Sequence, residues 1–253
     1  MRTPPPGHTK AKGGGVFLRF ALLIVTAAAL GGVMRRIVFL RRCGWWGAGK
    51  RLYRRAAWTL GLTAYAAMAV QELILLAAGL LNWRTGLPLH LCSMAGLLTL
   101  PMLLSGRRAL WHLSLYAGVP GALAALLFPA VLQTPWPHTT ALAFHLMHCM
   151  VVLAPFLPLA LGRTPSPWGA ASAFVLLALA ACLAGGVNAL TGGNYLFLHG
   201  PVAGTPLEAL ARGGLWPYRL RLAGLCAALL AAEGALTALI TRFRHCGEHH
   251  GLL

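Results

Sequence analysis

LPLHLCSMAGLLTLPMLL, residues 87–104, predicts a membrane helix, yet it begins with an imidazole and a thiol, those of His90 and Cys92. Polar side chains are costly inside a lipid bilayer, so they usually mark a functional site. A later apolar run repeats the arrangement with FHLMHC at residues 144–149. We therefore expect two membrane helices that carry polar chemistry near the same end of the bundle.

The composition indicates a polytopic membrane protein. Of its 253 residues, 58% are hydrophobic and 10% charged, whereas soluble domains contain about 25% charged residues. A spanning helix needs about 20 apolar residues. Seven segments qualify: 16–34, 56–81, 87–104, 109–131, 139–161, 168–190 and 216–240. We predict an all-α, seven-helix transmembrane bundle over residues 16–240, multi-pass in the cell membrane, with a disordered basic tail at 1–15 and a polar tail at 241–253.

The charge distribution predicts how the bundle is inserted. The net charge is +17, from 21 Lys and Arg residues against four acids, and the basic residues gather at the ends of apolar runs. Most fall on the side of the first and third connections, so the positive-inside rule places the N-terminus outside and the C-terminus in the cytoplasm. The first run ends at Arg35-Arg36, typical of a retained helix rather than a cleaved signal peptide. We expect membrane lipids, not nucleic acid, as partners; the oligomeric state is left open.

Cys92 and the later histidines are the candidates for catalysis. A thiol beside an imidazole is a nucleophile with its base. Cys92 lies about five residues into its predicted helix and His148 about nine residues into a later one, so they can meet if these helices touch. His145 is the rival base, and Glu72 is the candidate third member of a Cys-His-acid set. The alternative is that Cys92 is a small buried apolar residue.

Polar residues at the same end are candidates for binding substrate. They are His90, Asn188, Asn194 and Tyr195. His90 lies about 200° from Cys92 on a regular helix, so it orients the helix end rather than reacts. The amides near the end of the sixth helix can stabilise an oxyanion or bind a headgroup; the alternative is a glycine-rich helix C-cap.

The histidines and Cys92 also form a rival metal set. Together they offer ligands for zinc or copper, but Glu72 is the one carboxylate near them. The six cysteines contain no C-x-x-C pair, which excludes a zinc ribbon and argues against a disulfide framework. We therefore expect neither a metal nor another cofactor.

Four motifs together resemble one family. They are LPLHLC at 87–92, FPAVLQTPWPH at 128–138, FHLMH at 144–148 and VNALTGGNYLFL at 187–198. Over about residues 56–240 the chain resembles the YwaF-like bacterial integral membrane proteins, which are similar to an animal transmembrane acyltransferase acting on ether phospholipids. The resemblance implies lipid acyl transfer by a thioester relay, with Cys92 as nucleophile and His148, or else His145, as base.

Three functions follow from these patterns. The first is a lipid acyltransferase working through a Cys-His thioester relay near the outer leaflet. The second is a non-enzymatic transporter or lipid-binding protein that uses the same polar cluster. The third is a structural membrane partner without chemistry of its own.

Overall fold

The computed structural model describes residues 12–128 and 139–250, and every regular element in those ranges is a helix, as predicted. Residues 1–11 of the predicted N-terminal tail, and most of the 128–138 motif, lie outside this part of the chain. Six helical segments of the described residues are long and apolar enough to cross a membrane: Phe20–Arg42, Trp46–Ala77, Arg108–Leu127, Thr139–Leu161, Gly169–Thr191 and Leu215–Arg242. The chain is a multi-pass integral membrane protein.

The predicted third span is shorter than expected. Helix α3 covers Leu91–Ser105, which is 15 residues and about 22 Å at 1.5 Å per residue, against a hydrocarbon core about 30 Å thick. Residues 87–90 are not helical, because Pro88 disfavours the helical conformation of the residue before it and His90 is extended at φ −76° and ψ 147°. The structure therefore has six candidate spans and a short apolar helix, and the count of seven spans is not confirmed.

Both terminal regions are more helical than predicted. Helix α1 covers Lys12–Arg42 and α2 covers Trp46–Ala77, so the basic stretch predicted as a connection extends the two helices, since arginine and lysine are good helix formers. The turn between them is short, and Gly44 takes its positive φ of 79°. The predicted polar tail likewise continues α8, which covers Leu215–His250.

The fourth predicted helix contains a π-helical turn. Helix α4 covers Arg108–Leu113, η1 covers Ser114–Gly118 and α5 covers Val119–Leu127. The amide of Val119 donates to the carbonyl of Ser114, five residues back. Pro120 has no N–H, and its ring would clash with the carbonyl of Tyr116 in a regular helix. The wider turn relieves that clash.

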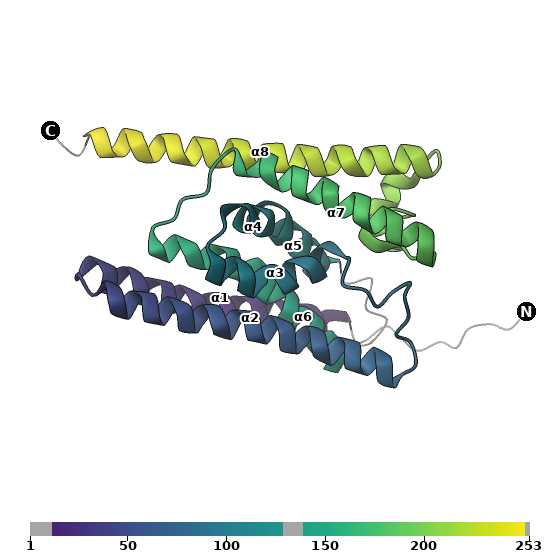
Figure 1. The fold of residues 1–253 in the computed structure, drawn as a ribbon, viewed down its shortest axis with the longest axis horizontal. Helices are drawn as coiled ribbons and strands as arrows, with labels where there is room; N and C mark the ends of the chain where they lie inside the picture. The colour runs from purple at the N-terminus through teal and green to yellow at the C-terminus, as the bar shows by residue number, and fades with distance from the viewer. Residues whose placement is uncertain (1–11, 129–138, 251–253) are drawn as a thin grey trace, which may run out of the picture.

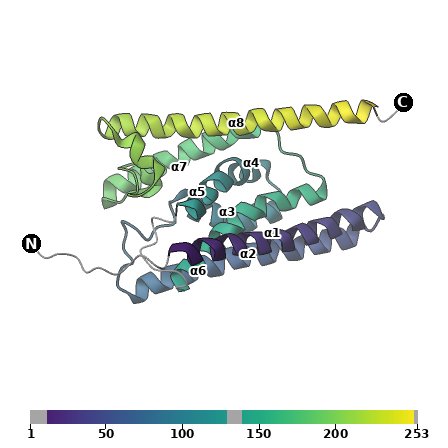
Figure 2. The ribbon, with the colours of Figure 1, turned by 180° about the vertical axis from the view of Figure 1, so that it is seen from behind.

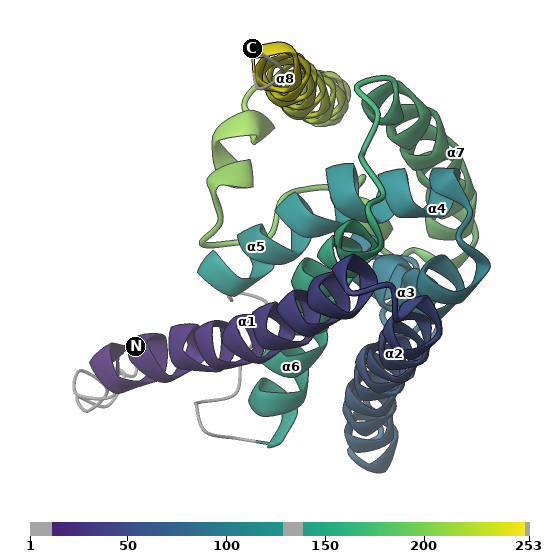
Figure 3. The same cartoon turned by 90° about the vertical axis from the view of Figure 1, so that its left-hand side faces the viewer.

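The remaining elements complete the bundle. They are α6 at Thr139–Leu153, η3 at Ala154–Leu161, α7 at Gly169–Thr191, η4 at Tyr195–Phe197 and η5 at Pro206–Ala211. Helices α1 and α2 lie along one side and α7 and α8 along the other, with α3 to α6 between them (Figure 1 and, from behind, Figure 2). Seen end-on, α6 runs through the middle of the α1–α5 group (Figure 3), and most of its span is buried.

The connections before α3 and before α8 meet at one end of the bundle. Arg84 Nε donates to the carbonyl of Thr191 at 3.0 Å, and the Tyr195 hydroxyl contacts both Trp83 and Leu87. The turn before α4 and the end of η3 lie at the opposite end, where Arg163 Nη1 donates to the Gly106 carbonyl. Two of the segments predicted to share one end, the connection before α3 and the loop after α7, are therefore in contact there. The orientation across the membrane stays a prediction.

Helices α2 and α3 pack at van der Waals distance because one of them lacks a side chain at the crossing. A Cβ added to Gly61 of α2 would lie 2.6 Å from Cβ of Leu100 on α3. We expect Gly61→Ala to lower the free energy of unfolding by about 1–3 kcal/mol, the usual cost of overpacking. Unfolding in mixed detergent micelles measures this change.

Gly32 of α1 is the matched control. A Cβ there meets nothing within 4 Å, so Gly32→Ala should leave stability unchanged or raise it, as alanine does in a helix. Equal effects of the two substitutions would contradict the close α2–α3 crossing.

Candidate functional site

The Leu91 side chain and the Cys92 thiol both lie beside Gly121 of α5. Leu91 Cδ2 lies 2.9 Å, and Cys92 Sγ 3.9 Å, from the place that a Cβ of Gly121 would occupy. One turn further along α3, Cβ of Ala95 lies 3.2 Å from the corresponding place at Gly118. Neither glycine stands out in the sequence. They bring the backbone of η1 and α5 against the face of α3 that carries the thiol.

Helix α6 packs against the same two elements. The Sδ of Met147 lies 3.5 Å from the Cβ place of Gly96 on α3, and Cγ1 of Val151 lies 3.7 Å from that of Gly118. At about 100° per residue, going round α6 from Met147 to Val151 and on by about 60° leads to His148. His148 therefore lies about 100° from Met147 and about 60° from Val151 around α6, and α6 packs against η1 and α5 as well as against α2. Cys92 lies next to α5, and the helix that carries His148 packs against the same segment.

Both histidines of α6 are bound through Nδ1 to their own helix. Nδ1 of His148 lies 2.7 Å from the carbonyl of Phe144, and Nδ1 of His145 lies 2.6 Å from that of Ala141. A carbonyl oxygen only accepts, so in each ring Nδ1 carries the hydrogen of this bond. His148 also packs on the Phe144 ring at 4.0 Å between centroids. Both rings are buried, which fixes their orientation.

The predicted thiol, imidazole and carboxylate are not joined by hydrogen bonds. Within the described ranges, Cys92 is a free thiol and no hydrogen bond connects it to His145 or His148. Glu72 of α2 is partly exposed, and its Oε2 has no partner in that same part of the chain. The Nδ1–H groups that an orienting carboxylate would bind are already bound to the helix backbone. The role of Glu72 as third member of the set stays a prediction.

Tyr195 ties the two connections at this end of the bundle. Its fully buried side chain donates a hydrogen bond to the carbonyl of Trp83 and accepts one from the amide of Leu87, both at 2.9 Å. Asn188, also fully buried, donates to the carbonyl of Tyr195 at 2.9 Å and accepts from its amide at 2.7 Å. These bonds fix the residues just before α3, and hence where the helix begins.

Asn194 has a similar structural role. Its Nδ2 donates to the carbonyl of Gly200 at 3.0 Å, and its Oδ1 accepts from the amide of His199 at 2.8 Å. The amides of Asn188 and Asn194 therefore build the loop after α7, a variant of the C-cap alternative, with Gly192 in the left-handed conformation at φ 70°. Binding of substrate by Asn188, Asn194 and Tyr195 stays a prediction.

His90 lies between two aromatic rings at the start of α3. Its ring centroid is 5.3 Å from that of Tyr195 and 5.1 Å from that of Phe197. Its buried Nδ1 has no hydrogen-bond partner among the residues the structure describes, and burial lowers the pKa of His90 below its usual value. The ring packs where α3 begins, and its role in positioning the helix end stays a prediction.

The loop that supplies Phe197 is strained. Leu196 and Phe197 have φ values of 54° and 58°, which non-glycine residues rarely adopt. Tyr218 holds this conformation by donating to the Phe197 carbonyl at 2.8 Å. Such strain is concentrated at functional sites, where the surrounding structure maintains it. Tyr218 belongs to the Trp216-Pro217-Tyr218 sequence in the first turn of α8, which is the sequence signal for this hydrogen bond.

Two other features lie apart from this end. In the described part of the chain, no group of three or more His, Cys, Asp or Glu side chains is arranged to hold a metal ion, so the rival set of His90, Cys92, His145 and His148 is not gathered as ligands.

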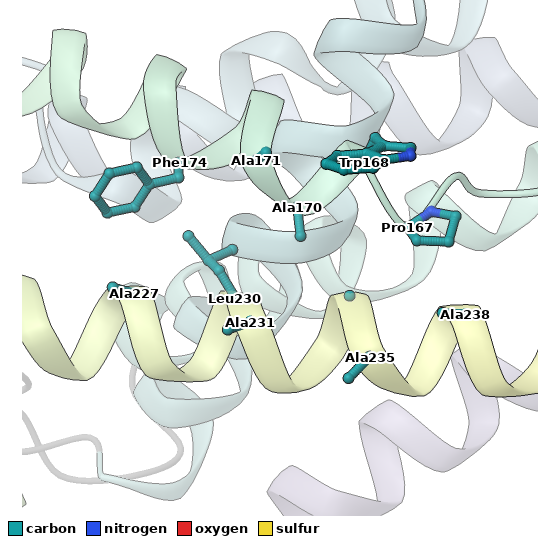
Figure 4. A pocket seen from close by; sticks show the side chains of 11 residues that line it. Pro167, Trp168, Ala170, Ala171, Phe174, Ala227, Leu230, Ala231, Ala235 and Ala238 are labelled. Carbon is teal, nitrogen blue, oxygen red and sulfur yellow. The ribbon is translucent and has the colours of Figure 1, made fainter.

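A groove of about 480 Å³ between α7 and α8 is lined by apolar residues, including Trp168, Phe174 and Leu230 (Figure 4). It contains none of the predicted site residues.

The fold and site define a multi-pass membrane protein whose polar side chains cluster between helices. The sequence pattern of the TMEM164 family matches residues 16–233, so the chain belongs to the TMEM164 family. The YwaF-like resemblance is not shown by this match, which begins in α1, before the start of the resemblance at residue 56. No curated protein and no solved structure matches the chain.

The Tyr195 hydroxyl gives a direct test of the clamp before α3. Tyr195→Phe leaves the amide of Leu87 and the carbonyl of Trp83 without their buried partner, and we expect a loss of about 2 kcal/mol in unfolding free energy. Amide hydrogen exchange of residues 83–90 should become faster at the same time.

Tyr65→Phe is the control, because that hydroxyl donates to the Leu97 carbonyl at an exposed position. It should have a smaller effect on stability and leave exchange at 83–90 unchanged. Unaltered exchange in Tyr195→Phe would show that the hydroxyl does not hold the connection.

Proposed function

We propose that this TMEM164-family protein is a lipid acyltransferase that carries the acyl group as a thioester on Cys92. The observation that supports this most is that the thiol lies beside Gly121 of α5, while α6, the helix that carries His148, packs against the same segment. A thiol and an imidazole near one membrane surface are the groups needed for acyl transfer. By the charge distribution, that surface is the outer leaflet.

The proposed reaction has two balanced halves. The Cys92 thiol gives its proton to Nε2 of His148, and its sulfur attacks the ester carbonyl carbon of a phospholipid. The carbon–oxygen bond of the ester breaks, and the leaving lysophospholipid oxygen takes the proton from His148. In the second half, the hydroxyl of an acceptor lysolipid gives its proton to His148 and attacks the thioester. A new ester bond forms to the acceptor oxygen, the carbon–sulfur bond breaks, and the leaving thiolate takes the proton back from His148, which restores the thiol.

The distance between sulfur and imidazole closes when substrate binds. Hydrogen bonds between catalytic groups are often long in substrate-free enzymes and shorten in the complex. The Nδ1–H bond to Phe144 keeps the His148 ring in one orientation during this step and stabilises the imidazolium that forms. It replaces the carboxylate of a Cys-His-acid set.

Acyl transfer from a labelled phospholipid to the protein tests the proposal. In nanodiscs containing a phospholipid with an alkyne-tagged acyl chain, the wild type should acquire a label that neutral hydroxylamine removes, as it does a thioester. Cys92→Ala should acquire none. His148→Gln should be labelled about 100-fold or more slowly, the usual contribution of a general base.

Cys226→Ala is the matched control, because that residue is a partly buried free cysteine of α8, a helix that carries neither Cys92 nor His148. It should label like the wild type. Equal labelling of Cys92→Ala and wild type would refute the thioester, and an unlabelled wild type that moves lipid or solute across the bilayer would favour the transporter.

A further inference from the structure

A second polar site lies at the opposite end of the bundle from Cys92. A pocket of about 310 Å³ is formed where α3 ends, α4 begins and η3 ends. It is lined by Gly106, Arg108, Trp111, Gly162, Arg163 and Thr164. Along α3 it is about 21 Å from Cys92, at 1.5 Å per residue. The proposed acyl transfer therefore does not use it.

Two arginines from separate elements each lie across a glycine that lines this pocket. The guanidinium of Arg163 lies over Gly106 and donates from Nη1 to its carbonyl at 2.9 Å. The guanidinium of Arg41, on α1, lies over Gly162, with Nη2 2.8 Å from the place of a Cβ there, and donates to the carbonyl of Ala160 at 2.7 Å. Both glycines have positive φ, 67° and 80°. A residue with a side chain would be strained at either position and would displace an arginine.

These contacts leave the positive charge without a counter-charge. The carbonyl partners are neutral, and no residue lining the pocket is acidic. Arg41 Nε is buried and has no partner in residues 12–128 and 139–250. A structural role in capping the ends of α3 and η3 explains one hydrogen bond of Arg41 and of Arg163. It does not explain Arg108, which lines the pocket together with Arg163, while Arg41 crosses Gly162 beside it.

The position of the pocket indicates what kind of anion it holds. The span Arg108–Leu127 begins there and the span Thr139–Leu161 ends there, so the pocket lies at the level of lipid headgroups. Trp111 presents an indole wall, since its Nε1–H is already bonded to the carbonyl of Pro155 at 2.7 Å. Guanidinium groups bind phosphate oxygens in pairs, and basic pockets between spanning helices hold anionic headgroups.

We infer that this pocket binds the phosphate group of an anionic phospholipid headgroup, through Arg108 and Arg163 with Arg41 beside them. The volume of about 310 Å³ admits a phosphate with part of its glycerol. The bound phosphate supplies the negative charge that no acidic residue of the lining supplies, and it links α1, α4 and η3 at this end of the bundle.

Native mass spectrometry of the delipidated full-length protein, titrated with phosphatidylglycerol, tests the inference. We expect one phosphatidylglycerol to bind more tightly than phosphatidylcholine. Arg108→Gln should weaken that first binding about fivefold, and Arg108→Gln with Arg163→Gln about 25-fold, the usual effect of one and of two basic residues at a headgroup. The single variant removes no hydrogen bond that caps a helix, so it does not depend on the folding of the double variant.

Arg54→Gln with Arg55→Gln is the matched control, because it removes the same charge from exposed positions of α2. It should bind phosphatidylglycerol like the wild type. Equal weakening in the control and the pocket variants would overturn the inference in favour of a general charge effect. Displacement of the lipid by an equal concentration of inorganic phosphate would overturn it in favour of a soluble phosphate. Lack of displacement supports the lipid headgroup.

Discussion

The close approach of α3, η1–α5 and α6 is the constraint on which the rest of the structure depends. It exists because Gly96, Gly118 and Gly121 have no Cβ where the neighbouring helix passes. In a membrane, helices associate mainly by packing, and small residues at the contact allow the backbones to come together. The same packing places the sulfur of Cys92 beside α5 and brings α6, the helix that carries His148, against that segment.

The π-turn and the aromatic clamp work with this packing. Pro120 forces the wide turn at Ser114–Gly118, and π-turns inside helices are often found at functional sites. At the end of the bundle, Tyr195 fixes the residues that precede α3, while its ring and that of Phe197 hold His90. Cys92 is therefore positioned from two directions, by the glycines along α3 and by the clamp before it.

The sequence was sufficient for the class of fold and for the end of the bundle where polar residues gather. Apolar length and low charge predict spanning helices because the bilayer requires both. It was not sufficient for the start of α3, because the patterns of 87–90 and 91–104 are equally apolar and Pro88 alone separates them. The helical extension over residues 35–42 could not be predicted either, because the apolar pattern ends at residue 34 while the helix continues to Arg42. Polar residues at a membrane surface can be helical or not.

The site could be predicted in its residue types but not in its hydrogen bonds. Cys92, His145 and His148 stand out as polar residues in apolar runs, whereas nothing in the sequence shows that backbone carbonyls occupy the Nδ1 positions and leave Glu72 without a histidine to orient. The glycines were overlooked because a glycine in an apolar run has no polar signature. Only the crossing of helices shows which of them matter.

A cryo-electron microscopy structure with a non-hydrolysable ether analogue of the donor phospholipid bound tests the central claim most directly. The quantity to measure is the distance between Sγ of Cys92 and Nε2 of His148. The account predicts a separation within hydrogen-bond reach, about 3.5 Å or one bridging water. Side chains that remain apart with aliphatic residues packed between them would contradict it.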